Sequence, residues 1–279
     1  ITEVRTSMVR SLYTAATGMM AQQTNVDTIA NNLANVNTTG YKAQTAQFKS
    51  LLYQTLQTAT TTANGDPKPT TSQVGLGVRN SSINSSFNQG SLLASSSDTA
   101  FAIEGEGFFA IQGSDGNTYY TRNGDFTWAT NGNRGMILTN QDGLPVLSST
   151  GRTITLGSNY ITSKITISQD GTVCYPDANN NAQSLGVKIG MYQFNNPGGL
   201  QRTGDSLFQA TAASGAVLNE ATNRNVTPSR MVQGYLEGSN VQVADEMVNL
   251  IVAQRAYEMN SKAITTTDEM MQTANNLKR

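Results

Sequence analysis

Near the C-terminus the chain reads Val243-Ala-Asp-Glu-Met-Val-Asn-Leu-Ile-Val-Ala-Gln-Arg-Ala-Tyr257, and apolar residues recur along it at a fixed interval. One apolar row, spaced seven residues apart, consists of Val243, Leu250, Tyr257, Ile264 and Met271. A second row lies four residues later, begins apolar and turns polar: Met247, Gln254, Ser261 and Asp268. A seven-residue period is typical of helices that pack along a coiled-coil seam. The spacing predicts one helix of about 38 residues, or roughly 57 Å.

The N-terminal end has the same period. Its first apolar row is Leu12, Met19, Val26 and Leu33, and its second row is Met8, Ala15, Gln22, Ile29 and Val36. The pattern predicts a helix from about Val9 to Val36, with Thr38-Thr39-Gly40 as its stop. We expect both ends of the chain to form one helical domain. The alternative is that each is an ordinary amphipathic helix packed on its own domain.

Amide side chains interrupt both helical segments. Asn is a mediocre helix former, but an Asn buried between helices can fix their register and the number of partners. We therefore expect these helices to be marginal alone and specific when assembled. The polar positions to which we assign this role, or contacts between subunits, are Asn31, Asn32, Asn35, Gln254 and Asn260.

Between the two ends, the seven-residue period gives way to short runs of residues that are typical of β-strands. Examples are Phe108-Phe-Ala-Ile111 and Val187-Lys-Ile-Gly-Met-Tyr-Gln-Phe194. Asn-Gly and Asp-Gly pairs separate these runs and favour tight hairpin turns; they lie at 115–116, 123–124, 131–132, 142–143 and 170–171. The predicted fold class is α+β, with long coiled-coil helices from both termini and a central all-β, mostly antiparallel domain.

These patterns divide the chain into five segments. Residues 1–7 are an expected extension, because Met8 is a plausible start. Residues 8–50 and 237–279 are the two halves of the helical domain. Residues 51–75 form an extended connector, whose low-complexity part carries Pro67 and Pro69, and residues 76–236 form the β-domain.

Composition excludes several classes of function. The chain of 279 residues has 18 Lys and Arg against 19 Asp and Glu, so it lacks the basic surface of a nucleic-acid binder. It has no His and one Cys, Cys174, which excludes a disulfide within the chain, a His-based triad and the usual zinc sites. No window is apolar enough to span a membrane. Only 13% of residues are charged, which suits a protein that meets many copies of itself.

Motifs for cofactors and metals fail on context. Gly105-Glu-Gly-Phe-Phe-Ala110 fits a dinucleotide fingerprint, but the residues that follow continue as a strand and not as a helix. Asp177-Ala-Asn-Asn-Asn181 begins like a calcium loop, but Ala182 replaces the required Gly and Lys188 the required Glu. We expect no cofactor, no metal and no catalytic residues. We expect the glycines at 105 and 107 to allow a tight turn or a β-bulge.

Long segments resemble a known family. Gly18-Met-Met-Ala-Gln-Gln-Thr-Asn-Val-Asp-Thr-Ile-Ala-Asn-Asn-Leu-Ala-Asn-Val-Asn-Thr-Thr-Gly-Tyr-Lys42 resembles the N-terminal signature of bacterial flagellar rod and hook proteins. The stretch from Ser239 to Lys262 is similar to their C-terminal signature, and 105–109 and 120–126 are similar to their β-domain motifs. Within the family, the total length and Leu51-Leu-Tyr-Gln-Thr-Leu56 are most similar to distal rod subunits.

The resemblance implies a structural subunit that stacks helically into a hollow drive shaft, transmits motor torque to the hook and passes exported subunits. The implied partners are further copies, other rod proteins, the hook protein, the type III export apparatus and, where an outer membrane exists, ring proteins. The implied location is the basal body outside the cytoplasmic membrane, reached without a cleaved signal peptide. The residues assigned to the seam and to assembly are Leu12, Met19, Val26, Ile29, Leu33, Val243, Met247, Leu250, Tyr257, Ile264 and Met271. Those assigned to the stiffening connector are Leu51, Tyr53 and Gln54.

Other interpretations remain open at this point. The chain could be another rod component or a small hook protein, because the terminal signatures are shared. A binding module would use its β-domain to hold a saccharide or a partner. An enzyme would need turnover without any His, metal or nucleotide motif.

Overall fold

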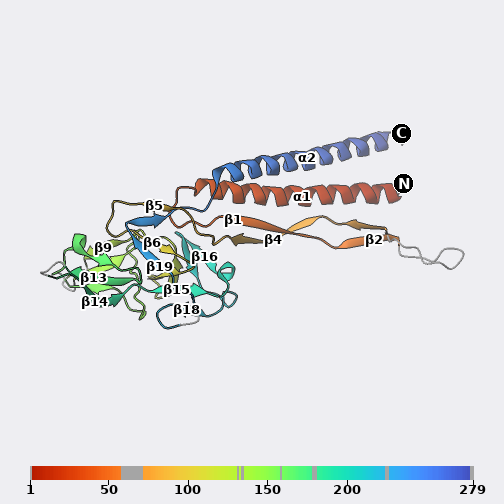
Figure 1. Cartoon of the computed structure of the whole chain (residues 1–279). Helices are drawn as coiled ribbons and strands as arrows, with labels where there is room; N and C mark the ends of the chain where they lie inside the picture. The colour runs from red at the N-terminus through yellow and green to blue at the C-terminus, as the bar shows by residue number, and fades with distance from the viewer. Residues whose placement is uncertain are drawn as a thin grey trace. The chain divides into compact units, whose positions relative to one another are not determined.

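The computed structural model describes residues 2–57, 72–130, 132, 135–157, 159–177, 181–223 and 226–276, and the chain divides into two compact units (Figure 1). Unit 1 consists of residues 1–34, 44–84 and 242–279. Unit 2 consists of residues 35–43 and 85–241. The prediction of an α+β chain with a central, mostly antiparallel β region is confirmed, because every strand pair with a recorded direction is antiparallel.

Unit 1 contains two long helices, α1 (Thr2–Ala34) and α2 (Val243–Asn276). They lie side by side and run in opposite directions, so that the start of α1 and the end of α2 are neighbours (Figure 1). Asp245 and Glu246 stand in the first turn of α2, where carboxylates favour the positive end of the helix dipole.

Helix α1 begins before the predicted Val9 and ends at Ala34, two residues before the predicted Val36, and a series of turns follows up to Gly40. Gly40 has another role. Its φ of +68° is left-handed, and a Cβ there would stand 2.5 Å from the backbone nitrogen of Asn123. Glycine is therefore required at this position for close packing of the chain within unit 2.

A two-stranded ribbon completes unit 1. Strand β1 (Gln44–Ser50) pairs with β4 (Val78–Ser85), and β2 (Tyr53–Gln57) pairs antiparallel with β3 (Ser72–Gly75). Hydrogen bonds from Leu51 N to Gly77 O (2.9 Å) and from Leu76 N to Leu52 O (3.2 Å) join the two pairs. The two ends of the segment predicted as a connector, residues 53–57 and 72–75, are therefore paired strands, and its low-complexity part, residues 58–71, lies outside the described residues.

The strands of unit 2 form several small sheets. The largest has six strands in the order β16 (Gln201–Gly204), β17 (Leu207–Gln209), β8 (Thr118–Thr121), β7 (Phe108–Gln112), β15 (Met191–Phe194) and β18 (Val217–Asn219). One three-stranded sheet has the order β11 (Thr155–Leu156), β10 (Met136–Thr139), β9 (Thr127–Thr130). A second has the order β12 (Thr166–Ile167), β13 (Thr172–Pro176), β14 (Ala182–Lys188). Two pairs remain, β19 (Arg230–Gln233) with β6 (Phe101–Glu104) and β20 (Tyr235–Glu237) with β5 (Leu92–Ala94).

Short turns join several neighbouring strands, as the Asp-Gly pairs predict. Gly116 and Gly171 have φ near +80° and connect β7 to β8 and β12 to β13. The prediction fails at 123–124, where β8 and β9 belong to different sheets. A Cβ on Gly124 would stand 1.7 Å from Phe101 O, so this glycine serves a close approach of two backbones. Part of the pair at 131–132 lies outside the described residues.

The apolar core lies in unit 2. Its main cluster contains fully buried side chains from several sheets, among them Phe101, Ile103, Phe109, Phe126 and Ile189. The aromatic rings meet edge to face, as in the pair Phe109–Phe126, whose centroids are 5.1 Å apart. Unit 2 also contains the short 3-10 helices η2 (Thr162–Lys164) and η3 (Pro197–Gly199).

Candidate assembly region

Helices α1 and α2 contact each other at two pairs of polar or small residues, Asn32 with Glu246 and Gly18 with Asn260. The Nδ2 group of Asn32 donates to Oε1 of Glu246 at 3.1 Å, and Asn32 is fully buried. Fourteen residues away on each helix, Gly18 faces Asn260, whose Nδ2 would stand 2.9 Å from a Cβ at Gly18. Both contacts fit one antiparallel register with a seven-residue period.

The same row of α2 continues through Ala253 and Thr267, which are both buried. The inward face of α2 therefore contains two rows of residues. One consists of Leu250, Ile264 and Met271, which belong to the predicted first row and are half-buried. The other consists of Glu246, Ala253, Asn260 and Thr267, each of which precedes a residue of the predicted second row. Small and polar residues let the helix backbones approach closely, and this is why a search for apolar periodicity missed that row.

Several predicted seam residues face solvent within this chain. Val243, Met247 and Tyr257 are 42%, 53% and 41% exposed, and Gln254 is exposed as well. On α1, by contrast, Ile29 is buried, and Leu12, Met19, Val26 and Leu33 are half-buried. The pairing of the two helices alone does not explain the exposed apolar positions of α2.

The Asn positions have different environments. Asn32 also accepts a hydrogen bond from Gln44 N and donates to Gln44 O, both at 2.8 Å, so it ties α1 to β1 as well as to α2. Burial raises the pKa of the Glu246 carboxyl, while the hydrogen bond from Asn32 opposes this rise. Asn35 accepts a hydrogen bond from the Thr38 hydroxyl in the turn after α1, and Asn31 is exposed.

The predicted connector residues lie on the ribbon. Leu51 and Gln54 belong to its backbone ladder, and Gln54 accepts a 3.4 Å hydrogen bond from Arg10 of α1. The ribbon also approaches α1 at Gly77, where φ is +112° and a Cβ would collide with the Thr17 hydroxyl. Leu52 and Tyr53 project outward, 82% and 61% exposed.

Exposed apolar side chains are concentrated in unit 1. On α2 they include Val248, Ile251, Val252 and Met259, each more than half exposed, and on α1 they include Tyr13 and Met20. A large set of exposed apolar residues on one part of a protein marks an interaction surface. Among the described residues, no helix has the length and apolarity to cross a membrane, and no cluster of three or more metal-binding side chains occurs.

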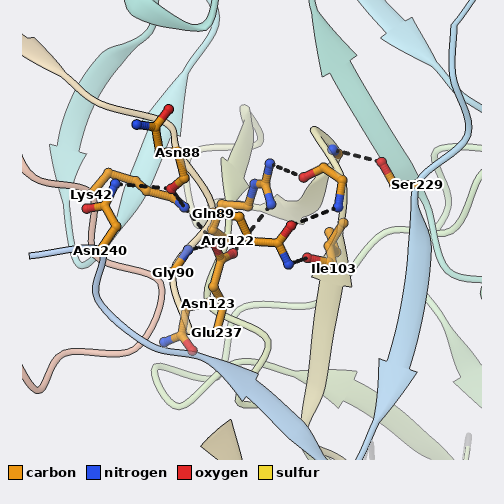
Figure 2. Close-up of polar contacts among 12 residues, drawn as sticks. Lys42, Asn88, Gln89, Gly90, Ile103, Arg122, Asn123, Ser229, Glu237 and Asn240 are labelled. Carbon is orange, nitrogen blue, oxygen red and sulfur yellow. Dashed lines mark hydrogen bonds and ion pairs between the residues drawn. The ribbon is translucent and has the colours of Figure 1, made fainter. Parts of the chain in front are cut away.

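Unit 2 contains a buried ion-pair cluster that the sequence analysis did not identify (Figure 2). The Lys42 ammonium donates to Oε1 of Glu237 at 2.6 Å, and Nη1 of Arg122 donates to Oε2 of the same carboxylate at 3.4 Å. All three side chains are at least 98% buried. Arg122 also donates to Gly105 O at 2.7 Å and stacks over Phe108, 5.0 Å from the ring centroid.

The cluster carries two cations against one anion. Burial lowers the pKa of Lys42 and of Arg122, and the Glu237 carboxylate opposes both shifts. Of the described side chains, only Arg122 has a buried polar atom, Nε, that lacks a hydrogen-bond partner. Removal of the Glu237 carboxylate would leave both buried cations without the anion that they contact, which is far more costly than loss of a surface pair.

Comparisons with known proteins agree with these features. Three family models match: "Flagella basal body rod protein" over residues 12–42, "Flagellar hook protein FlgE/F/G D1 domain" over 102–175 and "Flagellar basal body rod FlgEFG protein C-terminal" over 232–277. The buried cluster takes one charged residue from each matched segment: Lys42, Arg122 and Glu237.

Curated relatives match along almost the whole chain. The flagellar basal-body rod protein FlgG of Borreliella burgdorferi is 45% identical over 274 residues, 98% of this chain and all of that protein. The protein of the same name from Caulobacter vibrioides is 42% identical over 97% of this chain and all of that protein. The flagellar hook-basal body complex protein FlhP of Bacillus subtilis is 34% identical, again over 97% of this chain and all of that protein. The chain belongs to the family of flagellar basal-body rod proteins.

Proposed function

We propose that this chain is a distal rod subunit, which assembles helically with further copies into a hollow shaft that carries motor torque to the hook and passes exported subunits. The observation that carries the proposal is the near full-length similarity to rod proteins, combined with exposed apolar residues on unit 1. The role is structural and not enzymatic. The proposed partners are other rod proteins, the hook protein, the export apparatus and, where present, the outer rings, at the basal body outside the cytoplasmic membrane.

In this proposal α1 and α2 pair as a coiled coil in the inner wall of the shaft. The inward face of α2 serves the pair within a subunit, and its outer apolar residues pack against neighbouring subunits. The ribbon formed by residues 44–57 and 72–85 lies against neighbours and stiffens the shaft through its exposed residues Leu52 and Tyr53. Unit 2 forms the outer sleeve.

The two faces of α2 can be separated by matched substitutions. Leu250→Asp places a charge at the half-buried inner row, whereas Val252→Asp places the same charge at a position that is 62% exposed. We expect both variants to block assembly but only Leu250→Asp to reduce helix content in the dilute chain. Assembly of either variant at the wild-type level would refute the role given to its face.

The direct test is deletion of the gene in the native host, followed by electron microscopy of purified basal bodies. Bodies that stop at a short rod without a hook would support a distal rod subunit. Similarity to a hook-basal body complex protein favours one second candidate, another axial component. Complete rods that lack only the hook would favour this second candidate. Intact, rotating flagella would refute both the distal rod assignment and the second candidate.

A further inference from the structure

The chain crosses between the two units at four places, 34/35, 43/44, 84/85 and 241/242, and the unit 2 segments at the last three converge within that unit. Residues 40–43 lead to β1, residues 85–90 follow β4, and residues 237–241 lead to α2. We call these three segments the exits. Backbone hydrogen bonds already join them: Ser86 N donates to Ala43 O, and Gly40 N donates to Glu237 O, both at 2.8 Å.

The side chain of Asn240 connects all three exits, and Figure 2 shows it beside Asn88 of the second exit. Its Oδ1 accepts a 2.7 Å hydrogen bond from Ala43 N in the first exit. Its Nδ2 donates to Ser86 O at 2.9 Å and to Asn88 O at 3.0 Å in the second exit. One acceptor and two donor bonds use most of the hydrogen-bonding capacity of an amide, and neither a carboxylate nor an aliphatic side chain can reproduce them.

Glu237 joins the same exits a second time. Its carboxylate accepts hydrogen bonds from Lys42 Nζ in the first exit and from Gly90 N, at 3.0 Å, in the second. Lys42 also donates to Asn88 O at 2.8 Å. Gly90 approaches the third exit so closely that a Cβ would stand 2.1 Å from Gly238 O.

We propose that Asn240 and Glu237 form an exit clip, a single cooperative element that makes the three exits of unit 2 open and close together. The proposed mechanical use of the clip rests on the proposed rod function: a load on one exit would be shared by all three. The Lys42–Glu237 bond is buried and most of the other bonds of this network are partly buried. Connected hydrogen bonds of this kind strengthen each other, so loss of one member weakens the rest. The alternative is three separate exits with only local bonds.

Amide hydrogen exchange of the full-length dilute chain, resolved by residue, distinguishes these alternatives. The diagnostic amides are Gly40 and Gly90, whose acceptors are oxygens of Glu237 and not of Asn240. In Asn240→Ala we expect Gly40, Gly90 and Ala43 to exchange about tenfold faster or more. Leu147, which donates to Ala110 O in the β core, should be unchanged.

Two further variants sharpen the test. Asn240→Asp keeps an acceptor for Ala43 N but loses both donors, and should also accelerate Gly40 and Gly90. Asn196→Ala is the matched control, because the Asn196 side chain donates one 3.0 Å bond to Ala213 O elsewhere in unit 2. It should leave all three exit amides unchanged.

Faster exchange at Ala43 alone would overturn the exit clip, and so would equal acceleration at Leu147, which would indicate general destabilisation of unit 2. The measurement does not depend on assembly. Failure of the clip therefore leaves the rod assignment intact, whereas intact flagella after gene deletion would refute the rod assignment and leave the clip untouched.

Discussion

The two units of this chain use apolar residues in opposite ways. Unit 2 buries them: Ile103, Phe109, Phe126, Leu138 and Ile189 are all fully buried. Unit 1 exposes many of them, and in α2 only Ala253 and Thr267 are buried. Both clusters of buried apolar side chains lie in unit 2, so we expect this unit to fold without assembly partners. Helices of this kind gain most of their stability from packing against partners.

The contrast fits the proposed assembly into a shaft. In that proposal, unit 2 is folded before assembly, and the exposed apolar side chains of unit 1 become buried against neighbouring subunits. Substitutions should therefore lower the stability of the chain most in unit 2 and affect assembly most in unit 1.

The largest loss of stability is expected from the core of unit 2. Phe109→Ala should lower the free energy of unfolding of this unit by about 3–5 kcal/mol, because the buried ring leaves a cavity. Denaturant unfolding of the dilute chain measures this loss. Leu52→Ala in the ribbon is the control, since an 82% exposed side chain should change stability by less than about 0.5 kcal/mol. A loss below about 1 kcal/mol for Phe109→Ala would contradict the account.

Next in size is the buried ion pair. Glu237→Gln should cost about 3 kcal/mol, because it leaves the buried Lys42 and Arg122 cations without an anion. The matched control is Glu258→Gln in unit 1, where the pair with Arg255 is 64% exposed on the glutamate side and should contribute nothing measurable. Equal effects of the two substitutions on thermal unfolding would mean that the cluster is not essential to unit 2.

A smaller effect is expected at alkaline pH. Burial raises the pKa of Tyr120 to about 12 from 10.0, and the ring is 6% exposed. The unfolded chain therefore loses this proton first, and the stabilisation, complete below pH 10, is lost as pH rises towards 12. The loss is at most about 2–3 kcal/mol. In Tyr120→Phe, the free energy of unfolding should fall less between pH 10 and pH 12 than in the wild type. The same pH dependence in both proteins would mean that the burial of Tyr120 does not cause the fall.

The smallest effect concerns the register of the helix pair. Gly18→Ala should stabilise the chain by less than the roughly 1 kcal/mol that Ala usually gains over Gly in a helix interior, because the new Cβ meets the Asn260 side chain at 2.9 Å. In an Asn260→Ala background the same substitution should recover the full gain. Circular dichroism during denaturant titration measures the stability of the helices in each variant. If the effects of the two single substitutions add up exactly to that of the double variant, the two residues are not in direct contact.

Sequence reasoning identified what periodicity and turn chemistry encode. The seven-residue rows located both helices, and the alternation of short β runs with Asp-Gly turns located the antiparallel region. It named Asn260 as a polar register position but did not identify Ala253 and Thr267, which are buried on α2 although no apolar pattern marks them. It also treated the paired strands β2 and β3 as part of a connector, since pairing between distant segments leaves little local signal.

The buried cluster was beyond reach for a different reason. Lys42, Arg122 and Glu237 are far apart in sequence, and each looks like an ordinary surface charge where it stands. Only the fold brings them together. A usable signal existed nonetheless: Lys42 ends the N-terminal signature and Arg122 lies within the central motif Tyr120–Phe126, both of which were recognised as family motifs.

The central claim is that unit 2 is stable by itself whereas the helices of unit 1 depend on neighbouring subunits. Amide hydrogen exchange of α1, α2 and the β7–β15 core, compared between the dilute chain and assembled filaments, tests it most directly. The account predicts fast exchange of both helices in the dilute chain, slow exchange in filaments, and slow exchange of the β core in both. Helices as protected in the dilute chain as the β core would contradict it.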